Sequence, residues 1–179
     1  AVLCYKPGTG TLATGALYNN AIGNLLSDNP SLKRVKFIAE SQKTGTPIGV
    51  SGAVMVVNGD CLEIHTSASE FIFNEDCSSM FSDFTDLIEI DFNDCINTSN
   101  VTDMSAMFSN CRSLTSLDLT GFDFIKVKSF DGMFSSLGSN APDKPISVSV
   151  TQEGYDILKD KGTGINSYYA VLCSIDRLD

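Results

Sequence analysis

The sequence contains no tryptophan and only one histidine, His65. It has no apolar run near the roughly 18 residues that a membrane-spanning helix requires. Its six cysteines include no Cys-x-x-Cys pair, and one imidazole cannot complete the ligand set of a zinc site. The sequence therefore predicts no transmembrane segment and no zinc centre.

Basic residues are scarce in the middle of the chain. Residues 61–123 hold one basic residue, Arg112, against twelve acidic ones, and the whole chain carries a net charge of −10. A field of this sign repels nucleic acid phosphates, so we predict no nucleic acid partner. The hydrophobic content of 42% over 179 residues is typical of one globular domain, residues 1–179.

A methionine–phenylalanine pair recurs at a fixed period. The three copies begin 27 and then 26 residues apart, at Met80, Met107 and Met133. A period in this range is typical of a solenoid, whose units stack because none can bury its apolar face alone. The sequence therefore indicates a repeat architecture.

A second pattern, L-x-x-L-x-L or a looser form of it, lies between these copies. It recurs at residues 32–37, 61–66, 87–92, 114–119 and 145–150. Alternate inward-facing residues are typical of strands, so we predict that these five segments form one parallel sheet. Residues 170–175 are expected to add a sixth strand.

The segments before the later strands carry apolar residues at helical spacing, as from Val101 to Cys111 and from Val127 to Phe134. We predict short helices there that cover one side of the sheet and place Met107 and Met133 in the core. Further helices are predicted at residues 12–27 and 151–161, the second capped by Thr151. They would form an N-terminal cap (residues 1–31) and a C-terminal cap (residues 151–179) around the repeats (residues 32–150).

Two segments depart from the repeat. An antiparallel hairpin with a tight turn is predicted where residues 53–57 are followed by Asn58-Gly59 and then by the next strand. Residues 41–52, rich in Ser, Thr and Gly, are expected to form a mobile loop. Three cysteines fall on apolar slots of the repeat and are expected to be buried thiols: Cys61, Cys77 and Cys111.

The segment 101–119 resembles a known repeat. It runs V-T-D-M-S-A-M-F, then C-R-S-L, then L-D-L. In this it is similar to the repeats of bacterial surface proteins of the BspA-like family, which are leucine-rich-repeat-like, and the resemblance covers residues 74–134. Phe84 stands where the family favours Cys, and the family's F-D-T-S-x-V run reads F-D-F-I-K-V from Phe122 to Val127.

The resemblance implies an α/β fold: a leucine-rich-repeat-like solenoid with a parallel strand ladder, covered on one side by short helices and closed by helical caps. Members of the family include lipoproteins and adhesins on the surface of host-associated bacteria, and some occur in parasitic protists. The resemblance thus implies a cell-surface or secreted protein that binds other molecules, and it supplies no catalytic residues. The sequence starts at Ala1 without the features of a secretion signal, so in an exported or lipid-anchored form we expect such a segment to have been removed.

The outward-facing strand positions are the best candidates for a ligand site. In the predicted register, residues at equivalent positions of neighbouring strands form columns across the sheet. One column runs from His65 through Asp91 and Asp118 to Ser149, and a second holds Glu63, Glu89 and Ser116. We predict these as ligand-binding residues: Glu63, His65, Glu89, Asp91, Ser116 and Asp118. The alternatives are a solvated strand face, a calcium site, and the loop 41–52 with Lys43 as the docking surface.

Catalytic patterns are absent. Cys61 and His65 are expected to face opposite sides of the strand, with Cα atoms roughly 13 Å apart, which is too far for a Cys–His dyad. No Gly-x-Ser-x-Gly elbow occurs. We therefore expect a binding module for adhesion, not an enzyme, with no cofactor or metal and with a protein or glycan on a host or neighbouring cell as its partner, for which a basic surface would be suitable. A structural spacer without its own ligand is the alternative, and a small hydrolase in an atypical fold is a third.

Overall fold

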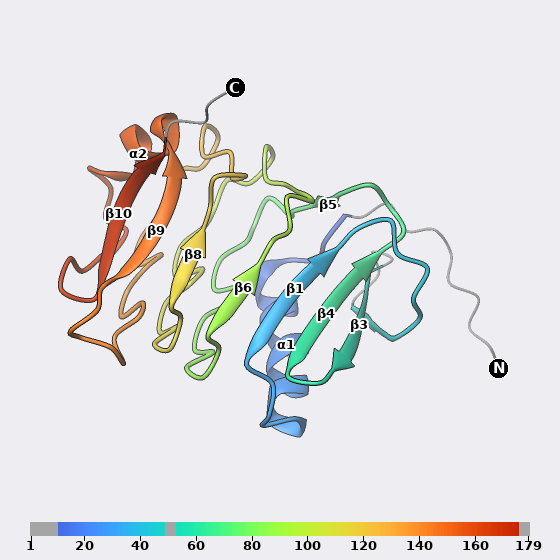
Figure 1. Cartoon of the computed structure of the whole chain (residues 1–179). Helices are drawn as coiled ribbons and strands as arrows, with labels where there is room; N and C mark the ends of the chain where they lie inside the picture. Colours follow the sequence, from blue (N-terminus) through green and yellow to red (C-terminus); the bar gives the residue numbers. More distant parts are fainter. Residues whose placement is uncertain (1–10, 49–52, 176–179) are drawn as a thin grey trace.

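The computed structural model describes residues 11–48 and 53–175. The helices are α1 (Gly15–Asp28) and α2 (Gln152–Leu158). The strands are β1 (Arg34–Ile38), β2 (Thr46–Ile48), β3 (Ala53–Asn58), β4 (Cys61–Thr66), β5 (Phe71–Ile72), β6 (Glu89–Asp91), β7 (Ile96–Asn97), β8 (Ser116–Asp118), β9 (Ile146–Thr151) and β10 (Ala170–Ile175). The longer strands lie side by side in front of a wall of stacked turns, as Figure 1 shows.

The predicted parallel ladder is confirmed. Strands β4, β1 and β6 pair in parallel, and so do β8, β9 and β10, which includes the sixth strand that we expected. The repeat alignment gives the correct register for two of the strand pairs. Residues that it placed in the same slot lie opposite each other, as Val35 does to Ile90 and Leu117 to Val148. The inward residues of these strands are buried in one apolar core, so the architecture is a β-solenoid.

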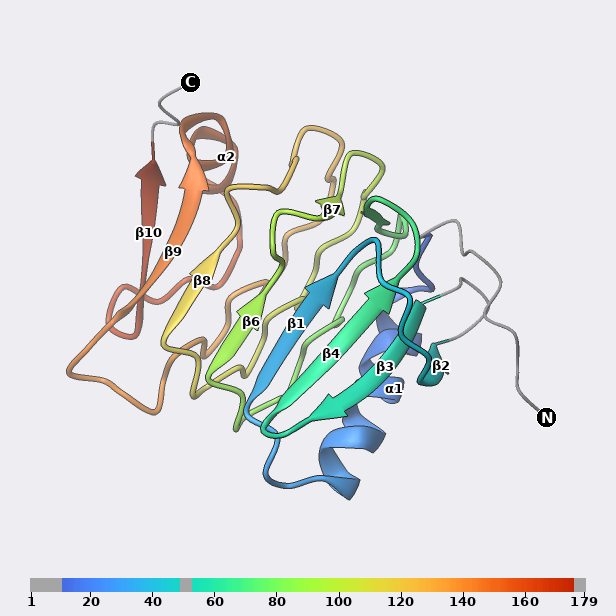
Figure 2. The same ribbon diagram turned by 45° about the vertical axis from the view of Figure 1, so that its right-hand side comes forward.

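The order of the strands is not the order of the chain. We predicted that the second strand would lie between the first and the third, but β1 lies between β4 and β6 (Figure 2). After β1 the chain forms the hairpin of β3 and β4 on one edge of β1, and then continues through β5 to β6 on the other edge. The hairpin turn reverses the chain so that β4 runs parallel to β1 and can pair with it.

The register of β4 was also predicted wrongly, by two residues. Leu62 lies opposite Val35, where the repeat alignment had placed Ile64. Leu62 and Ile64 are the two inward-facing apolar residues, and both are fully buried. Cys61 and His65 therefore share the outward face of the strand, and the prediction that Cys61 faces the core is wrong.

The prediction of a single sheet is wrong as well, because the ladder is divided between β6 and β8. Among the described residues, one backbone hydrogen bond joins these two strand segments, from the Thr115 N–H to the Ile88 carbonyl at 3.3 Å. The coils nevertheless stay stacked, because the turns behind the strands are bonded to one another.

The helices predicted within the repeats are turns. In each copy two residues four positions apart have positive φ, and these are Ser79 and Asp83, Ala106 and Asn110, and Gly132 and Ser136. Alternate N–H groups bond to the next coil, as from Phe81 to the Met107 carbonyl at 2.9 Å. The N–H groups between them close four-residue β-turns, as from Met107 to the Met104 carbonyl at 3.2 Å. An α-helix permits neither feature, since its donors bond within one segment and its φ values stay negative.

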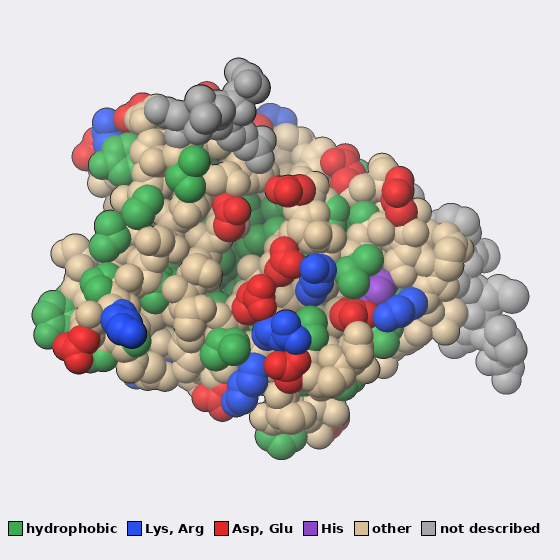
Figure 3. All heavy atoms as spheres, viewed as in Figure 1, with side chains coloured by type: hydrophobic (Ala, Val, Ile, Leu, Met, Phe, Trp, Pro, Cys, Tyr) green, Lys and Arg blue, Asp and Glu red, His purple; other side chains and the backbone are tan. Residues whose placement is uncertain are grey.

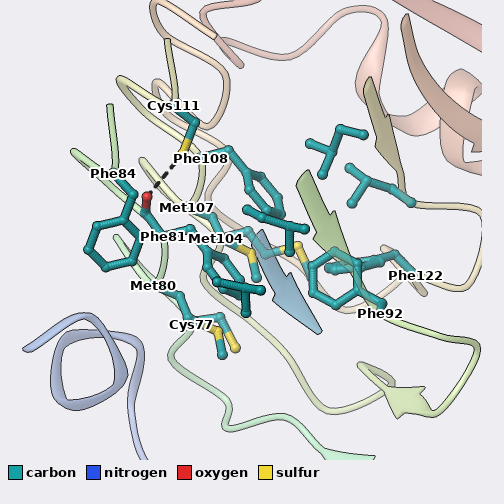
Figure 4. Packing of buried hydrophobic residues seen from close by; sticks show 14 of the residues in the cluster. Cys77, Met80, Phe81, Phe84, Phe92, Met104, Met107, Phe108, Cys111 and Phe122 are labelled. Atoms are coloured by element: carbon teal, nitrogen blue, oxygen red, sulfur yellow. Dashed lines mark hydrogen bonds between the residues drawn. The ribbon is translucent and has the colours of Figure 1, made fainter. Parts of the chain in front are cut away.

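These turns bury the residues that a helix would have buried. Met107 and Met133 are core residues, as predicted. The rings of Phe81, Phe108 and Phe134 hold equivalent positions in successive coils and stack with centroids 5.5 and 6.1 Å apart. Figure 4 shows the first two of these rings within the core. Offset stacking of this kind adds to the energy of apolar burial and fixes the spacing of the coils.

The antiparallel hairpin of β3 and β4 is confirmed. Its turn residues are Gly59 and Asp60, one position later than predicted, and Gly59 supplies a φ of +61°. The predicted loop 41–52 contains strand β2, which pairs with β3, so that part of the prediction is wrong. Residues 49–52 of the loop lie outside the described residues.

Both predicted end helices are present as α1 and α2. The Thr151 hydroxyl accepts a hydrogen bond from the Gly154 N–H at 3.1 Å, as a capping residue does. Helix α1 lies against the first turn of the back wall, where Asn19 donates to the carbonyls of Ser79 and Ser82 at 2.9 Å each. Their role as caps of the repeat array stays a prediction.

Candidate functional site

The structure separates the six predicted ligand-binding residues into two groups. Four of them line one cavity at the division of the ladder, and these are Glu89, Asp91, Ser116 and Asp118. Glu63 and His65 lie on β4, on the far side of β1, in a polar cluster of their own. The predicted columns are therefore wrong for β4, because the register partner of Asp91 on that side is Lys36 and not His65.

The cavity between β6 and β8 has a volume of about 200 Å³ and is here called the seam groove. Its lining includes three apolar core side chains, which are Ile90, Phe92 and Phe122. In Figure 3, acidic side chains surround a hollow with a hydrophobic floor in this part of the strand face. The groove thus combines an apolar floor with charged groups at its rim, so it offers both apolar and polar contacts to a partner.

Two successive corners of the solenoid differ in length beside the groove. The segment 91–101 has one residue more than the corresponding segment 118–127. The longer corner turns through Asn93 and Asp94, which both have positive φ. Asp91 fixes that corner by accepting the Asn93 N–H at 2.8 Å, and Asp118 does the same for Thr120 at 2.9 Å.

The charges on the two sides of the seam groove differ. On the β6 side, Lys36 pairs with Asp91 at 3.0 Å and Arg34 lies 3.9 Å from Glu89. On the other side, no ion pair within residues 11–48 and 53–175 involves Asp118. Since exposed pairs in water neutralise only part of the field, the groove as a whole stays negative.

The polar cluster on β4 is built around Glu63 and His65, which are 9% and 2% exposed. His65 Nε2 lies 2.8 Å from Glu63 Oε2, and His65 Nδ1 lies 2.7 Å from the Ser41 hydroxyl. Lys43 Nζ and Asn58 Nδ2 each donate to Glu63 at 2.7 Å. The bonds from Lys43, Asn58 and His65 lower the pKa of Glu63 from 4.5 to about 2, although burial acts in the opposite direction.

Sequence reasoning missed Ser41 and Asn58 as partners of His65 and Glu63. Lys43 had been singled out only as part of an alternative docking loop, and the structure places it on the predicted site residue Glu63. Glu63 and His65 share the outward face of β4, because Leu62 and Ile64 face inward. Nothing in the sequence indicated that the loop folds back over this face.

Three of the cysteines, Cys61, Cys77 and Cys111, are buried as predicted. Burial raises the pKa of the Cys77 thiol and of the Cys111 thiol to about 12. Cys111 donates to the Phe81 carbonyl at 3.0 Å (Figure 4). All five cysteines in the described part of the chain are free thiols, and Cys4 lies outside that part. Thiols that are buried and protonated are inert.

The described residues contain neither a metal-binding cluster nor a helix that could span a membrane. Across the described ranges, no three His, Cys, Asp or Glu side chains are placed to hold a metal ion, so the alternative of a calcium site has no geometric support. Neither α1 nor α2 has the length and apolar character that crossing a bilayer demands.

Comparison with known proteins gives one match. Residues 70–154 match the family model described as "Mycoplasma protein of unknown function, DUF285". The match starts just before β5 and ends in α2, so it includes the seam groove and leaves out α1, β1 and the hairpin of β3 and β4. No curated protein matches, and no solved structure matches.

Proposed function

We propose that this chain is a cell-surface or secreted binding module whose contact surface is the strand face of the solenoid, centred on the seam groove. Three observations support the proposal. The repeats resemble those of bacterial surface proteins, and the family match covers the same stretch of the chain. The strand face carries the groove with its apolar floor, and a rigid, parallel ladder is a suitable scaffold for a recognition surface.

The acidic rim of the groove indicates what kind of partner it would bind. A basic protein surface fits a pocket with four carboxylates on or near its rim: Glu89, Asp91, Asp94 and Asp118. An anionic glycan or a nucleic acid would be repelled by the same field. The role proposed for the groove is therefore adhesion to a basic region of a protein on a host or neighbouring cell.

The finer features of the fold belong to this proposal. We infer that α1 and α2 cap a leucine-rich-repeat-like array, because α1 occupies the place in the back wall where a preceding turn would stack. Helix α2 follows β9 directly and buries Leu158 against the same core. Caps of this kind protect the apolar ends of a solenoid from water.

The proposal is tested by the binding of an arginine- and lysine-rich peptide, with the double variant Asp91→Asn, Asp118→Asn as the probe of the groove. We expect slower association and a weaker salt dependence for this variant. Asp143→Asn, Asp160→Asn is the matched control, since it removes the same charge from exposed positions outside the groove. An equal slowing of association in both double variants would show that net charge alone attracts the peptide. No binding by the wild type would favour the structural spacer.

A further inference from the structure

The polar cluster on β4 contains a serine, an imidazole and a carboxylate in one hydrogen-bonded chain. Ser41 Oγ lies 2.7 Å from His65 Nδ1, and His65 Nε2 lies 2.8 Å from Glu63 Oε2. A nucleophile within hydrogen-bond reach of a base, with the base oriented by a third group, is the arrangement of covalent hydrolases. The cluster is separate from the seam groove and plays no part in the binding function proposed above.

The direction of the protons in this chain follows from the partners of Glu63. Glu63 stays ionised at neutral pH, so it can only accept hydrogen bonds. His65 must then donate from Nε2, and in a neutral imidazole Nδ1 then carries no proton and can only accept. The Ser41 hydroxyl consequently donates to His65 Nδ1. The Lys43 backbone N–H donates to Ser41 Oγ at 3.1 Å, which agrees with this direction.

The surrounding structure holds the three groups in place. The Ser41 N–H bonds to the Thr66 carbonyl at 2.8 Å, and the preceding residue, Glu40, has a φ of +57°, an uncommon conformation for a residue with a side chain. His65 is almost fully buried, while Ser41 is half-buried and belongs to an exposed loop segment. The imidazole is thus shielded and fixed, whereas Ser41 keeps part of its surface in contact with solvent.

We propose that Ser41, with His65 as its general base and Glu63 as the residue that orients His65, is a nucleophile for the acyl group of small carboxylic esters. Ser41 Oγ would form a bond to the ester carbonyl carbon while its proton passes to His65 Nδ1. The bond to the leaving alcohol would then break, and the alcohol would take that proton. Water, deprotonated by His65, would release the acid and restore Ser41.

The proposal is tested with p-nitrophenyl acetate and a fluorophosphonate probe, with the modified residue located by peptide mass mapping. Ser31 is the reference, because it is exposed, lies outside the seam groove, and has no histidine bonded to it: the only histidine of the chain is His65. Catalysis by a general base typically raises a rate by roughly 10²–10⁴-fold, so Ser41 should be labelled faster than Ser31 by a factor in that range. Ser41→Ala should abolish the p-nitrophenol burst, and Ser31→Ala should leave it unchanged.

The role of Glu63 requires a readout that a folding defect would not mimic. The charged groups that the structure places against His65 are Glu63 and, through the same carboxylate oxygen, Lys43. Glu63→Gln should slow labelling of Ser41 and change the pH profile of the labelling rate, while the far-UV spectrum stays native. Labelling of Ser41 no faster than that of Ser31, or acetylation of Lys43 in its place, would overturn the proposal.

Discussion

The N-terminal region (residues 11–66) and the repeat region (residues 71–151) contribute to the same parallel ladder in different ways. In the repeat region each coil stacks on the one before it, and equivalent residues such as Phe81 and Phe108 stack at equivalent places. In the N-terminal region the chain instead places β4 and β6 on opposite edges of β1. A regular period therefore specifies how coils stack, and a hairpin can still change which strands become neighbours.

This difference determines the chemistry of the strand face. Strand β1 brings Arg34 and Lys36 between the acidic residues of β4 and β6, so that Asp91 gains a cation as its neighbour. The equivalent residue of the next coil, Asp118, lies opposite Ser149 in the ladder. Two carboxylates at the same slot of the repeat thus have different electrostatic surroundings, and they face each other across the seam groove.

The largest effect is expected from a charge placed in the core of the repeat region. Met107→Asp would bury an uncompensated carboxylate among stacked coils and should cost several kcal/mol, about the whole stability of an ordinary domain. The control Ile125→Asp alters a side chain that is 65% exposed and should change stability by less than about 0.5 kcal/mol. Thermal unfolding measures both, and a Met107→Asp variant with the melting temperature of the wild type would contradict the core assignment.

The second prediction concerns the polar cluster of the N-terminal region. Glu63→Gln removes the charge that Lys43, Asn58 and His65 bond to, and should destabilise the fold by about 1–2 kcal/mol at pH 7. Because the folded-state pKa of Glu63 is depressed from 4.5 to about 2, its contribution is complete above pH 4.5 and is lost as the pH falls toward 2. Melting temperatures of the two proteins should therefore converge in that window. A constant difference from pH 7 to pH 2 would contradict the prediction.

The third prediction compares a back-wall turn with a true helix. Ala106 has a φ of +52°, so Ala106→Gly should be neutral or stabilise the protein by up to about 1 kcal/mol, because glycine adopts this conformation without strain. Ala21 lies inside α1, where Ala21→Gly should destabilise by about 1 kcal/mol. Equal destabilisation by both substitutions in denaturant unfolding would indicate that residues 104–111 are helical after all.

The back wall also shows how far the sequence could predict the fold. The apolar spacing identified the buried residues of the turns, including Met107 and Met133, and it identified the strands. It could not distinguish a helix from these turns, because both bury residues at intervals of three and four positions. The distinguishing signal was present at the polar positions, where Asp83 and Asn110 are residue types that tolerate positive φ.

The candidate site was predictable only in part, for a reason that lies in β4. The acidic residues of β6 and β8 were predicted from their own coils, and they line one groove. Glu63 and His65 were assigned to the wrong columns because the L-x-x-L-x-L pattern fits β4 in two registers that differ by two residues. Neither the division of the ladder nor the position of β1 leaves a local signal, since both depend on contacts between distant segments.

The smallest effect on stability, and the most direct test of the charge difference, is expected from Lys36. Its ion pair with Asp91 is at the surface, so Lys36→Met should change the free energy of unfolding by less than about 1 kcal/mol. The same change leaves Asp91 without its cation and makes the groove more negative, so a basic peptide should associate faster at low salt. Lys128→Met removes the same charge from an exposed position that does not line the groove and should alter association less. If stopped-flow measurements give equal rates for both variants, the cations of β1 do not set the charge of the seam groove, and the two regions would differ in topology alone.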